Sequence, residues 1–308
     1  MSKKTVLGFV GPTASGKTAL SIAMAQAVKG HILCMDSMQV YRGMDIGTAK
    51  PTREEQAQAP HHLLDLAEPA QPFSVADYQR LAQPLLEELP HPILVGGTGL
   101  YLKAVSYPMS LGSTVSDPQV RARYQAIADT QGNEALHRIL EQRDPVSADR
   151  LHQNDTRRVI RALEVLELTG KPFSAQRLPE EEASPFRFAL FALDWERDVL
   201  YRRINLRVDQ MLKDGLMEEV AALKDAGVPR DAQAMQGLGY KELLAHFDGE
   251  MTLEETVELI KRRTRNYAKR QLTWFRADAR VHWLPAAEGR LPGLNDIMRI
   301  LEEEHIDP

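Results

Sequence analysis

Short apolar runs alternate with amphipathic stretches over the first third of the chain. The apolar runs 5–10, 31–35 and 92–95 each precede glycine or polar turn residues, which is typical of buried strands. Between these runs, residues 18–28 and 77–88 have helical periodicity. This alternation predicts a doubly wound α/β fold with a parallel sheet.

The pattern changes after residue 117, because strand-like runs are absent as far as residue 178. Three stretches there have helical periodicity: 118–131, 132–142 and 154–169. The apolar run 186–193 then resumes the sheet. We therefore expect a core domain formed by residues 1–116 and 186–308, and a small helical insertion domain at 117–185.

The remainder of the core domain is predicted to be mainly helical. Helical periodicity extends over residues 197–226, 240–247 and 253–276, and one more short strand is expected at 281–284.

Composition narrows the class of protein. The 38 basic and 43 acidic side chains give a net charge of −5, and 43% of the residues are apolar, as in soluble globular proteins. The single cysteine, Cys34, excludes an internal disulfide and a thiolate metal cluster. No apolar run approaches the roughly 20 residues that span a bilayer, and the first ten residues predict no signal peptide. We expect a cytoplasmic monomer without membrane contacts.

One motif sets the class of chemistry. The octet GPTASGKT at residues 11–18 matches G-x-x-x-x-G-K-[ST] between an expected strand and an expected helix. In such a loop the backbone N–H groups surround a phosphate, Lys17 adds a mobile cation and the Thr18 hydroxyl can hold Mg²⁺. We predict a phosphate site, with Mg²⁺ as cofactor and Thr18 as its ligand, formed by Gly11, Pro12, Thr13, Ala14, Ser15, Gly16, Lys17 and Thr18.

Two further segments are expected near this phosphate site. Asp36 ends the strand expected beside the phosphate loop, where it is a candidate Mg²⁺ ligand or general base, with a turn cap as the alternative. Asp194 follows another apolar run, but a structural role is favoured for it. The sequence GGTG at residues 96–99 ends the third strand at the same edge and brings Thr98 there.

Basic residues are concentrated in two regions. Residues 261–280 contain eight basic residues against Asp278 alone, a local charge of +7 in a chain of −5. Helical spacing places Arg262, Arg265, Lys269 and Arg276 on one stripe, opposite a more buried face with Val257, Ile260, Thr264 and Tyr267. A second group in the insertion consists of Arg121, Arg123, Arg157, Arg158 and Arg161. Together these groups favour RNA as a second substrate, although a solvated helix face is the alternative.

Specific segments of the chain resemble the tRNA dimethylallyltransferase family. They begin with GPTASGKT at Gly11 and include DSMQVYRGMDIGTAKP at Asp36, PHHLLDL at Pro60, GGTGLYLKA at Gly96, NDTRRVIRALEV at Asn154, LDWERDVLYRRINLRVDQML at Leu193, LGYKE at Leu238 and KRQLTWFR at Lys269. The resemblance covers nearly the whole chain in order. It implies a P-loop NTPase-like core with a helical insertion, and transfer of the dimethylallyl group of dimethylallyl diphosphate to the exocyclic amine of an adenosine beside the anticodon, with Mg²⁺.

The resemblance also assigns roles to residues. It implies that the phosphate loop holds the prenyl diphosphate, that Asp36 is the general base, and that Lys17, Thr98 and Arg207 lie at the reacting centre, Arg207 beside the diphosphate. It implies contacts with the tRNA anticodon loop by Asp36, Ser37, Met38, Gln39, Thr98, Arg121, Arg157, Arg158, Val159, Ile160, Arg161, Gln236, Gly239, Tyr240, Lys241, Lys269, Arg270, Gln271, Trp274 and Arg276.

Two other classes of protein remain open from the residues alone. A small-molecule kinase would use the phosphate loop for ATP and would explain Asp36, but it gives the arginine groups no role. A non-catalytic RNA-binding protein with a phosphate loop would explain the arginines and leave Asp36 and Thr98 without one.

Overall fold

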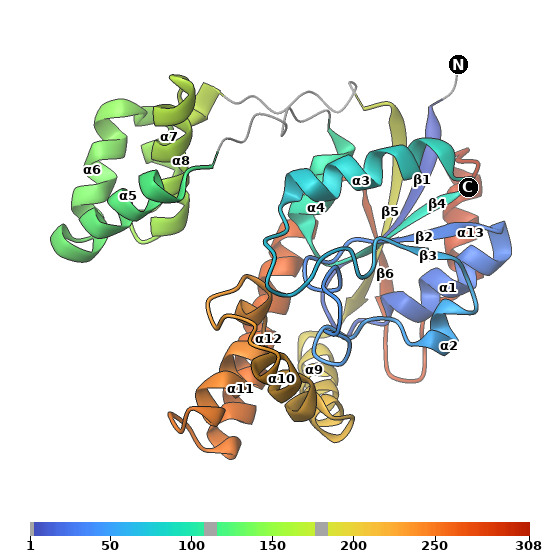
Figure 1. The fold of residues 1–308 in the computed structure, drawn as a ribbon. Helices are drawn as coiled ribbons and strands as arrows, with labels where there is room; N and C mark the ends of the chain where they lie inside the picture. The colour runs from blue at the N-terminus through green and yellow to red at the C-terminus, as the bar shows by residue number, and fades with distance from the viewer. Residues whose placement is uncertain (1–2, 108–115, 176–183) are drawn as a thin grey trace. The chain divides into compact units, whose positions relative to one another are not determined.

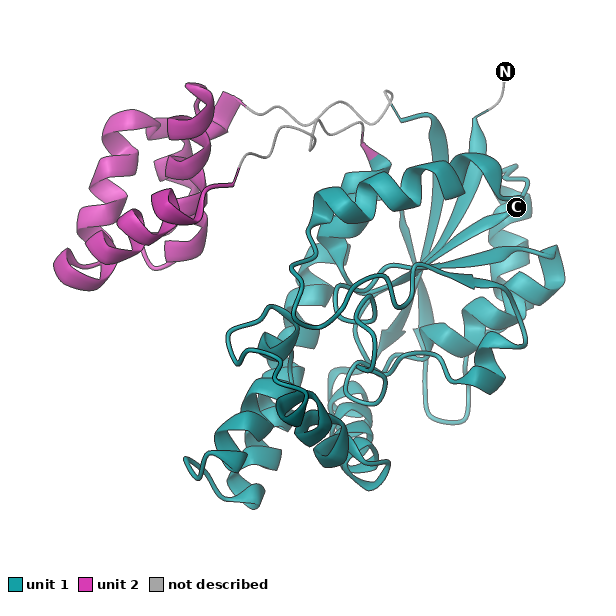
Figure 2. Cartoon of the chain, viewed as in Figure 1, with its two compact units in different colours: residues 1–106, 184–308 teal, residues 107–183 magenta. Residues whose placement is uncertain are grey.

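The computed structural model describes residues 3–107, 116–175 and 184–308 of the chain, which form two compact units (Figures 1 and 2). One unit consists of residues 1–106 and 184–308, and the other of residues 107–183. The sequence placed the insertion at 117–185. Both of its expected boundaries lie close to segments, 108–115 and 176–183, that are outside the described residues.

Parallel strands form the sheet of the larger unit in the order β3-β2-β4-β1-β5-β6 (Figure 1). Their bounds are β1 Lys4–Val10, β2 His31–Cys34, β3 His61–His62, β4 Pro92–Gly96, β5 Phe186–Trp195 and β6 Val281–Ala286. The predicted strands at 5–10, 31–35, 92–95, 186–193 and 281–284 are confirmed. The additional strand β3 is two histidines long, too short and too polar for an apolar pattern to indicate it.

The strand order corrects the expected position of Asp36. β1 lies between β4 and β5, so β4 separates it from β2 and from the aspartate that follows β2. The register places Val10 of β1 level with Gly96 of β4 and Ala192 of β5. The strand beside the phosphate loop on this side is therefore β4. Even so, the carboxyl ends of all three strands bring residues 11–18, Asp36 and Thr98 to one edge of the sheet.

Helices cover both faces of the sheet, which confirms the doubly wound α/β fold. Val6 and Val10 of β1 point into a core shared with α3 and α4, whereas Leu7 and Phe9 point into a second core shared with α1 and α13. The helix bounds are α1 Lys17–Val28, α2 Arg53–Gln56, α3 Val75–Glu88, α4 Gly99–Ser106 and α13 Leu294–Glu303.

A group of helices follows β5 in the larger unit. They are α9 Arg197–Lys213, α10 Leu216–Asp225, α11 Tyr240–Phe247 and α12 Leu253–Arg276, with a 3-10 turn at Ala234–Gln236. The predicted helices at 240–247 and 253–276 are confirmed. The stretch 197–226, expected as one helix, is divided into α9 and α10 because Gly215 adopts φ of +103°, a left-handed conformation that interrupts the helix.

The smaller unit is helical in its described residues, as predicted. Its helices are α5 Pro118–Gln131, α6 Asn133–Arg143, α7 Pro145–Arg150 and α8 Thr156–Thr169, followed by a 3-10 turn at Phe173–Ala175. Val120, Leu136, Leu140 and Leu163 belong to a buried core of its own. The unit therefore has the apolar interior that an independent domain requires.

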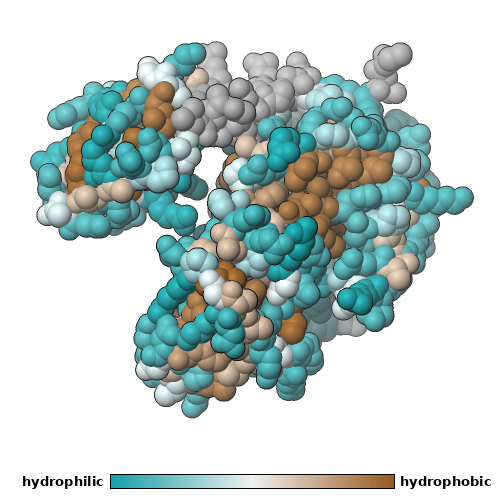
Figure 3. All heavy atoms as spheres, viewed as in Figure 1, coloured by the Kyte–Doolittle hydropathy of each residue, from teal (hydrophilic) through white to brown (hydrophobic). Residues whose placement is uncertain are grey.

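Hydrophilic side chains cover most of the visible face of the larger unit, interrupted by an apolar region beside α3 (Figure 3). Leu206 of α9 and Trp274 of α12 are among the exposed large apolar side chains. In the described part of the chain, none of the helices has the length and hydropathy of a membrane span.

Candidate active site

The phosphate loop, residues 11–18, connects β1 to α1. Gly11 and Gly16 have φ of +116° and +105°, which a residue with a side chain adopts only with strain. Lys17, the first residue of α1, donates a hydrogen bond from Nζ to the carbonyl of Pro12 at 2.5 Å. The ammonium group is therefore folded back over its own loop, as a phosphate site requires.

Two residues from much later in the chain, Trp195 and Arg203, bind backbone carbonyls of the phosphate loop. Trp195 at the end of β5 donates from Nε1 to the carbonyl of Ser15 at 2.8 Å, and Arg203 of α9 donates from Nε to the carbonyl of Ala14 at 2.9 Å. The Arg203 guanidinium also lies 4.3 Å from the centre of the Trp195 ring, in a cation–π contact. The loop conformation is therefore fixed before any ligand binds.

Gln271 of α12 connects the phosphate loop to the turn after β4. Its Oε1 accepts from the backbone N–H of Thr13 at 3.1 Å, and its Nε2 donates to the carbonyl of Gly97 at 2.9 Å. A Cβ at Gly97 would lie 1.9 Å from that Nε2 atom, so position 97 requires glycine. The sequence predicts Gln271 as a tRNA contact, whereas its amide is engaged inside the protein.

Lys17, Arg207 and Asp36 interact electrostatically at this edge of the sheet. Burial, and after it repulsion by Arg207, lowers the pKa of Lys17 to about 7 despite the attraction of Asp36. Burial also lowers the pKa of the Arg207 guanidinium. Burial raises the pKa of Asp36. This effect outweighs the lowering of the pKa by hydrogen bonds from the turn and by the positive charges of Lys17 and Arg207. The structure thus brings Lys17, Arg207 and Asp36 within electrostatic range of one another at this edge of the sheet.

Asp36 starts a tight turn. Its Oδ1 accepts from the backbone N–H of Met38 at 2.8 Å and of Gln39 at 3.3 Å, so its predicted alternative role as a turn cap is present. Among the described residues, none donates a hydrogen bond to Oδ2. Thr98 Oγ1 accepts from the backbone N–H of Ser37 at 3.2 Å. The turn therefore fixes the carboxylate through Oδ1 and leaves Oδ2 without a hydrogen bond from the described residues.

The side chain of Gln39 connects this turn to the far end of the same loop. Its Nε2 donates to the carbonyls of Thr48 and Ala49, both at 3.0 Å, and its Oε1 accepts from the Cys34 thiol at 3.0 Å. Gln39 is a predicted tRNA contact, but its amide group is occupied in positioning the loop. Cys34 is buried in β2, as expected of a strand residue.

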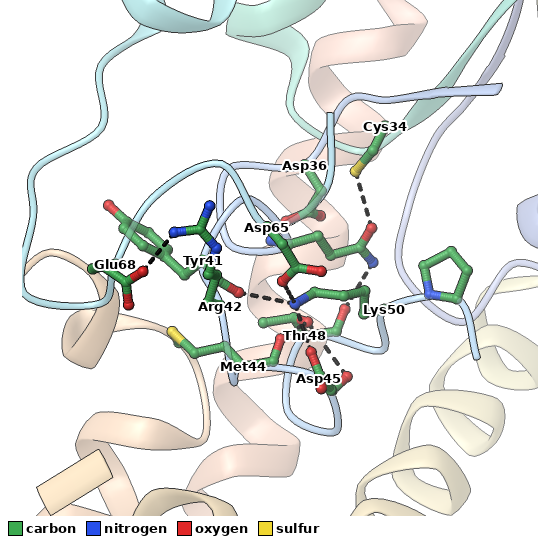
Figure 4. Close-up of polar contacts among 12 residues, drawn as sticks. Cys34, Asp36, Tyr41, Arg42, Met44, Asp45, Thr48, Lys50, Asp65 and Glu68 are labelled. Carbon is green, nitrogen blue, oxygen red and sulfur yellow. Dashed lines mark hydrogen bonds and ion pairs between the residues drawn. The ribbon is translucent and has the colours of Figure 1, made fainter. Parts of the chain in front are cut away.

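A buried ammonium group holds the same loop from the other side (Figure 4). The Lys50 side chain is only 4% exposed, and its Nζ donates to the carbonyl of Tyr41 at 2.9 Å. It also pairs with Asp45 at 2.5 Å and Asp65 at 2.6 Å. The buried charge is thereby compensated, which makes Lys50 a support for residues 36–50.

The basic stripe predicted on α12 lies opposite the buried residues of that helix, such as Ile260 and Phe275. Ile260 is buried as expected, whereas Val257, Thr264 and Tyr267 are only half-buried.

Within the basic stripe of α12, Arg265 donates to Asn205 at 2.6 Å and Arg276 pairs with Asp194 at 3.1 Å. Arg262 and Lys269 are exposed, and neither forms an ion pair within the described residues. Lys261, Arg263 and Arg280 also pair internally, so the free positive charge is smaller than the sequence suggests.

Trp274 lies beside the turn that carries Thr98. It is 39% exposed, and a Cβ at Gly99 would lie 2.1 Å from its Nε1 atom. Lys103 Nζ is 5.9 Å from the ring centre. Phe275 is buried and Trp283 is half-buried, whereas Trp274 is exposed rather than packed in the core. Of these three aromatic residues, Trp274 is the most exposed.

The arginines of the insertion divide into two kinds. Arg121 Nε and Arg161 Nη1 both donate to the buried carboxylate of Glu164, at 2.8 Å and 2.5 Å. Arg158 pairs with Asp155 at 3.4 Å. Arg157 is exposed and forms no ion pair within the described residues. Val159 and Ile160, predicted as tRNA contacts, are buried in the core of this unit, which leaves surface contacts in residues 157–161 to the arginines.

Residues 236–241 are mostly engaged within the protein. Gln236 donates to the carbonyl of Arg230 at 2.8 Å, and Gly239 donates its backbone N–H to Glu242 at 2.8 Å. Tyr240 is buried and donates its hydroxyl to Glu219 at 2.5 Å. Lys241 at the start of α11 is half-buried.

The loop fits a Mg²⁺ ion that is shared with a bound phosphate. Within the described residues, no cluster of three or more His, Cys, Asp or Glu could hold a metal ion. Mg²⁺ commonly takes only one or two protein oxygens besides water and substrate phosphates, and the Thr18 hydroxyl can supply one. The Ser15 hydroxyl is buried in the same loop without a hydrogen-bond partner among the described residues, and an oxyanion would provide one.

Comparison with known proteins identifies the family. A family model described as IPP transferase matches residues 39–278, and one described as Isopentenyl transferase matches residues 4–66. The tRNA dimethylallyltransferase of Halalkalibacterium halodurans is 50% identical over 286 residues, which are 91% of each chain. The chain belongs to the tRNA dimethylallyltransferase family.

Solved structures of this family share the fold. The full-length tRNA isopentenylpyrophosphate transferase from Bacillus halodurans is 46% identical, with a TM-score of 0.72, over 98% of this chain and 96% of that chain. A eukaryotic dimethylallyltransferase acting on tRNA is 27% identical, with a TM-score of 0.78, over 97% of this chain and 78% of that chain. The P-loop-like core predicted from the sequence is thus the fold of the dimethylallyltransferases.

Several residues of this dimethylallyltransferase site are not evident from motifs. Trp195 and Arg203 support the phosphate loop, and Lys50 and Glu219 support the loop after Asp36. Trp195, Arg203 and Glu219 act through contacts with backbone groups far along the chain, and Lys50 acts through the carbonyl of nearby Tyr41. A sequence pattern carries no signal for such contacts.

Proposed function

We propose that this chain transfers the dimethylallyl group of dimethylallyl diphosphate to the exocyclic amine of an adenosine beside the anticodon of tRNA. The observation that carries the proposal is the meeting of Lys17, Arg207 and Asp36 at the phosphate loop. Two cations suit a diphosphate leaving group, and a carboxylate with one unoccupied oxygen suits an amine nucleophile.

On the donor side, the diphosphate binds to Lys17 and to the backbone of residues 11–18. Arg207 faces the negative charge of the diphosphate. The bond between the allylic carbon and the diphosphate oxygen breaks with its electron pair leaving on the oxygen. Lys17 and Arg207 stabilise the negative charge that develops there. Thr18 would hold a Mg²⁺ ion, which would further neutralise the charge of the diphosphate.

On the acceptor side, the exocyclic nitrogen forms the new bond to the allylic carbon and must lose a proton. Asp36 Oδ2 accepts that proton, while Oδ1 stays hydrogen-bonded to the turn. Burial raises the pKa of Asp36 and makes its carboxylate a stronger base. A positioned base contributes roughly 10²- to 10⁴-fold to the rate.

The acceptor base must leave its stack to reach this site, as in other enzymes that modify nucleobases. Exposed side chains that can bind the surrounding RNA include Lys269, Arg270 and Trp274 of α12 and Arg157 and Arg158 of α8. They supply phosphate contacts and one stacking surface. We propose that the enzyme acts in the cytoplasm as a monomer.

A labelling assay separates the three classes of function. The protein is incubated with Mg²⁺, unmodified tRNA and either labelled dimethylallyl diphosphate or labelled ATP. The proposal predicts that label from dimethylallyl diphosphate is incorporated into tRNA. Consumption of ATP with no incorporation into tRNA would indicate a kinase or ATPase, and tRNA binding without turnover would indicate a binding protein.

A further inference from the structure

The carboxylate of Glu219, on α10, binds three successive backbone N–H groups of the loop that follows Asp36. Its Oε2 accepts from Asp45 at 2.8 Å and Ile46 at 2.7 Å, and its Oε1 accepts from Gly47 at 3.0 Å. Such a row of converging N–H groups binds an anion tightly. Residues 45–47 are therefore held by a group that lies more than 170 residues further along the chain.

Glu219 also binds the segment on the other side of the loop. Tyr240 donates its hydroxyl to Glu219 Oε1 at 2.5 Å, and the Tyr240 ring packs against Gly47, where an added Cβ would lie 2.6 Å from it. A Cβ at Gly237 would likewise lie 2.5 Å from Met38 Cε, so residues 236–241 also pack against the turn that Asp36 starts.

Hydrogen bonds joined by short stretches of backbone lead from Glu219 to Asp36. Residues 45–47 are bonded to Glu219, and the next carbonyls, those of Thr48 and Ala49, accept from the Gln39 side chain. The backbone N–H of Gln39 in turn donates to Asp36 Oδ1. The side chain of Asp45 is also paired with Lys50 (Figure 4). The position of Asp36 thus depends on a loop whose far end is bound to α10.

We propose that Glu219 is a positioning residue for Asp36: its carboxylate holds residues 45–47 so that Asp36 Oδ2 is aimed at the reacting amine. The proposal rests on the proposed function, because it assumes that Asp36 is the base. Glu219 itself touches neither substrate, and it acts through the loop. A misplacement of about 1 Å at a reacting group can cost on the order of 10²-fold in rate.

The experiment measures single-turnover transfer from dimethylallyl diphosphate to tRNA by four proteins: wild type, Glu219→Gln, Asp36→Asn and the double variant. Glutamine keeps the size of the side chain but replaces an acceptor oxygen by a donor that opposes the backbone N–H groups. We expect Glu219→Gln to lower the rate by about 10-fold or more in the wild-type background. In the Asp36→Asn background the same change should alter the rate by less than about twofold, because the base is already gone.

A merely structural role for Glu219 predicts a different result. The rate would then fall by the same factor in both backgrounds, or dimethylallyl diphosphate affinity would fall in step with it, and either result would overturn the proposal. An unchanged rate in Glu219→Gln would overturn it too. If wild type itself transfers no label, the proposed function fails, which is a result distinct from equal losses in an active enzyme.

Two further variants keep the test decisive. Glu218→Gln is the matched control, since Glu218 is the exposed neighbour on the same helix, and it should leave the rate unchanged. Tyr240→Phe removes one donor to Glu219 and leaves the carboxylate in place. If Glu219→Gln does not fold, Tyr240→Phe decides: a loss that disappears in the Asp36→Asn background supports the proposal, and no loss overturns it.

Discussion

Lys17 is the residue whose charge state should control donor binding. Its pKa of about 7 in the free protein results mainly from burial. A bound diphosphate places negative charge beside the ammonium group and raises this pKa, so binding takes up a proton wherever the free lysine is neutral. Donor affinity should therefore be highest below pH 7 and should fall as the pH rises above it.

Calorimetric titration with a non-hydrolysable dimethylallyl diphosphate analogue between pH 6 and 9 checks this expectation. Lys17→Arg is the matched control, because arginine stays charged over this range and should abolish that part of the pH dependence. Lys17→Ala should weaken donor binding while tRNA affinity stays nearly the same. Donor affinity independent of pH in the wild type, or an equal loss of tRNA affinity in Lys17→Ala, would argue against this role.

At the scale of secondary structure elements, α12 supports the donor site through Gln271. Gln271→Ala removes the partners of the Thr13 N–H and the Gly97 carbonyl, both of which bind this buried amide. An unpaired buried polar group costs about 1–3 kcal/mol, so we expect a comparable loss of unfolding free energy together with weaker donor binding. Chemical denaturation and donor titration measure both quantities. Thr273→Ala, on the exposed side of α12, should change neither, and full retention of both in Gln271→Ala would contradict the account.

The face of α12 opposite Gln271 is expected to bind RNA phosphates through Arg262 and Lys269, which form no ion pair with any residue that the structure describes. Arg262→Ala combined with Lys269→Ala should weaken tRNA binding and lower the slope of log affinity against log salt by up to about one unit per lost phosphate contact. Binding measured over a salt series tests this. The charge-matched control is Arg290→Ala with Arg299→Ala, outside α12, and a salt slope equal to that of wild type in the α12 variant would show that this face is merely solvated.

The elements themselves were largely predictable, because each depends on a local pattern. The five longer strands, the helical insertion and the basic stripe of α12 follow from the periodicity of nearby residues, and the phosphate loop follows from one octet. The order of the strands could not be predicted, because the pairing of β4 with β1 depends on contacts between residues that are far apart in the sequence. Nor could the division at Gly215, where a single left-handed residue interrupts a continuous helical pattern.

The site residues were predictable where they lie in a motif, and less so where charge alone suggested them. Lys17, Asp36 and Thr98 lie together because parallel strands end at the same edge. Arg121 and Arg161 have the charge of RNA-binding residues, yet both bind the buried carboxylate of Glu164. The sequence alone does not distinguish a basic residue that is free to bind RNA from one that is already paired with a carboxylate of the same protein.

At the scale of the whole molecule, the two compact units have separate cores. Glu164, at 0% exposure, holds the smaller one by accepting from Arg121, Arg161 and the Asp117 backbone N–H. Burial alone would raise the pKa of Glu164, but these hydrogen bonds outweigh it and lower the pKa. The contribution of Glu164 to stability is therefore present above its ordinary pKa of 4.5 and lost as the pH falls below it.

Glu164→Gln removes the negative charge that Arg121 and Arg161 bind, so we expect the smaller unit to lose about 1–3 kcal/mol of unfolding free energy. The loss is modest because both arginines are partly solvated, and the larger unit should be unchanged. Hydrogen exchange, followed separately for peptides from 118–169 and from the sheet, measures the two units side by side. Glu134→Gln is the control, since Glu134 pairs only weakly with Arg138 on the surface. Equal loss of protection in the sheet would show that the units unfold as one.

We propose Asp36 as the base for the exocyclic amine as it bonds to the allylic carbon of dimethylallyl diphosphate, whose diphosphate group the phosphate loop holds. Single-turnover transfer by Asp36→Asn, measured over a Mg²⁺ series, tests it most directly, because asparagine keeps the size and one acceptor oxygen but not the proton affinity. The account predicts a fall of roughly 10²-fold or more at every Mg²⁺ concentration, with tRNA binding almost unchanged. Recovery of the rate by excess Mg²⁺ would instead make Asp36 a metal ligand, and near-normal transfer would leave it only the cap of its turn.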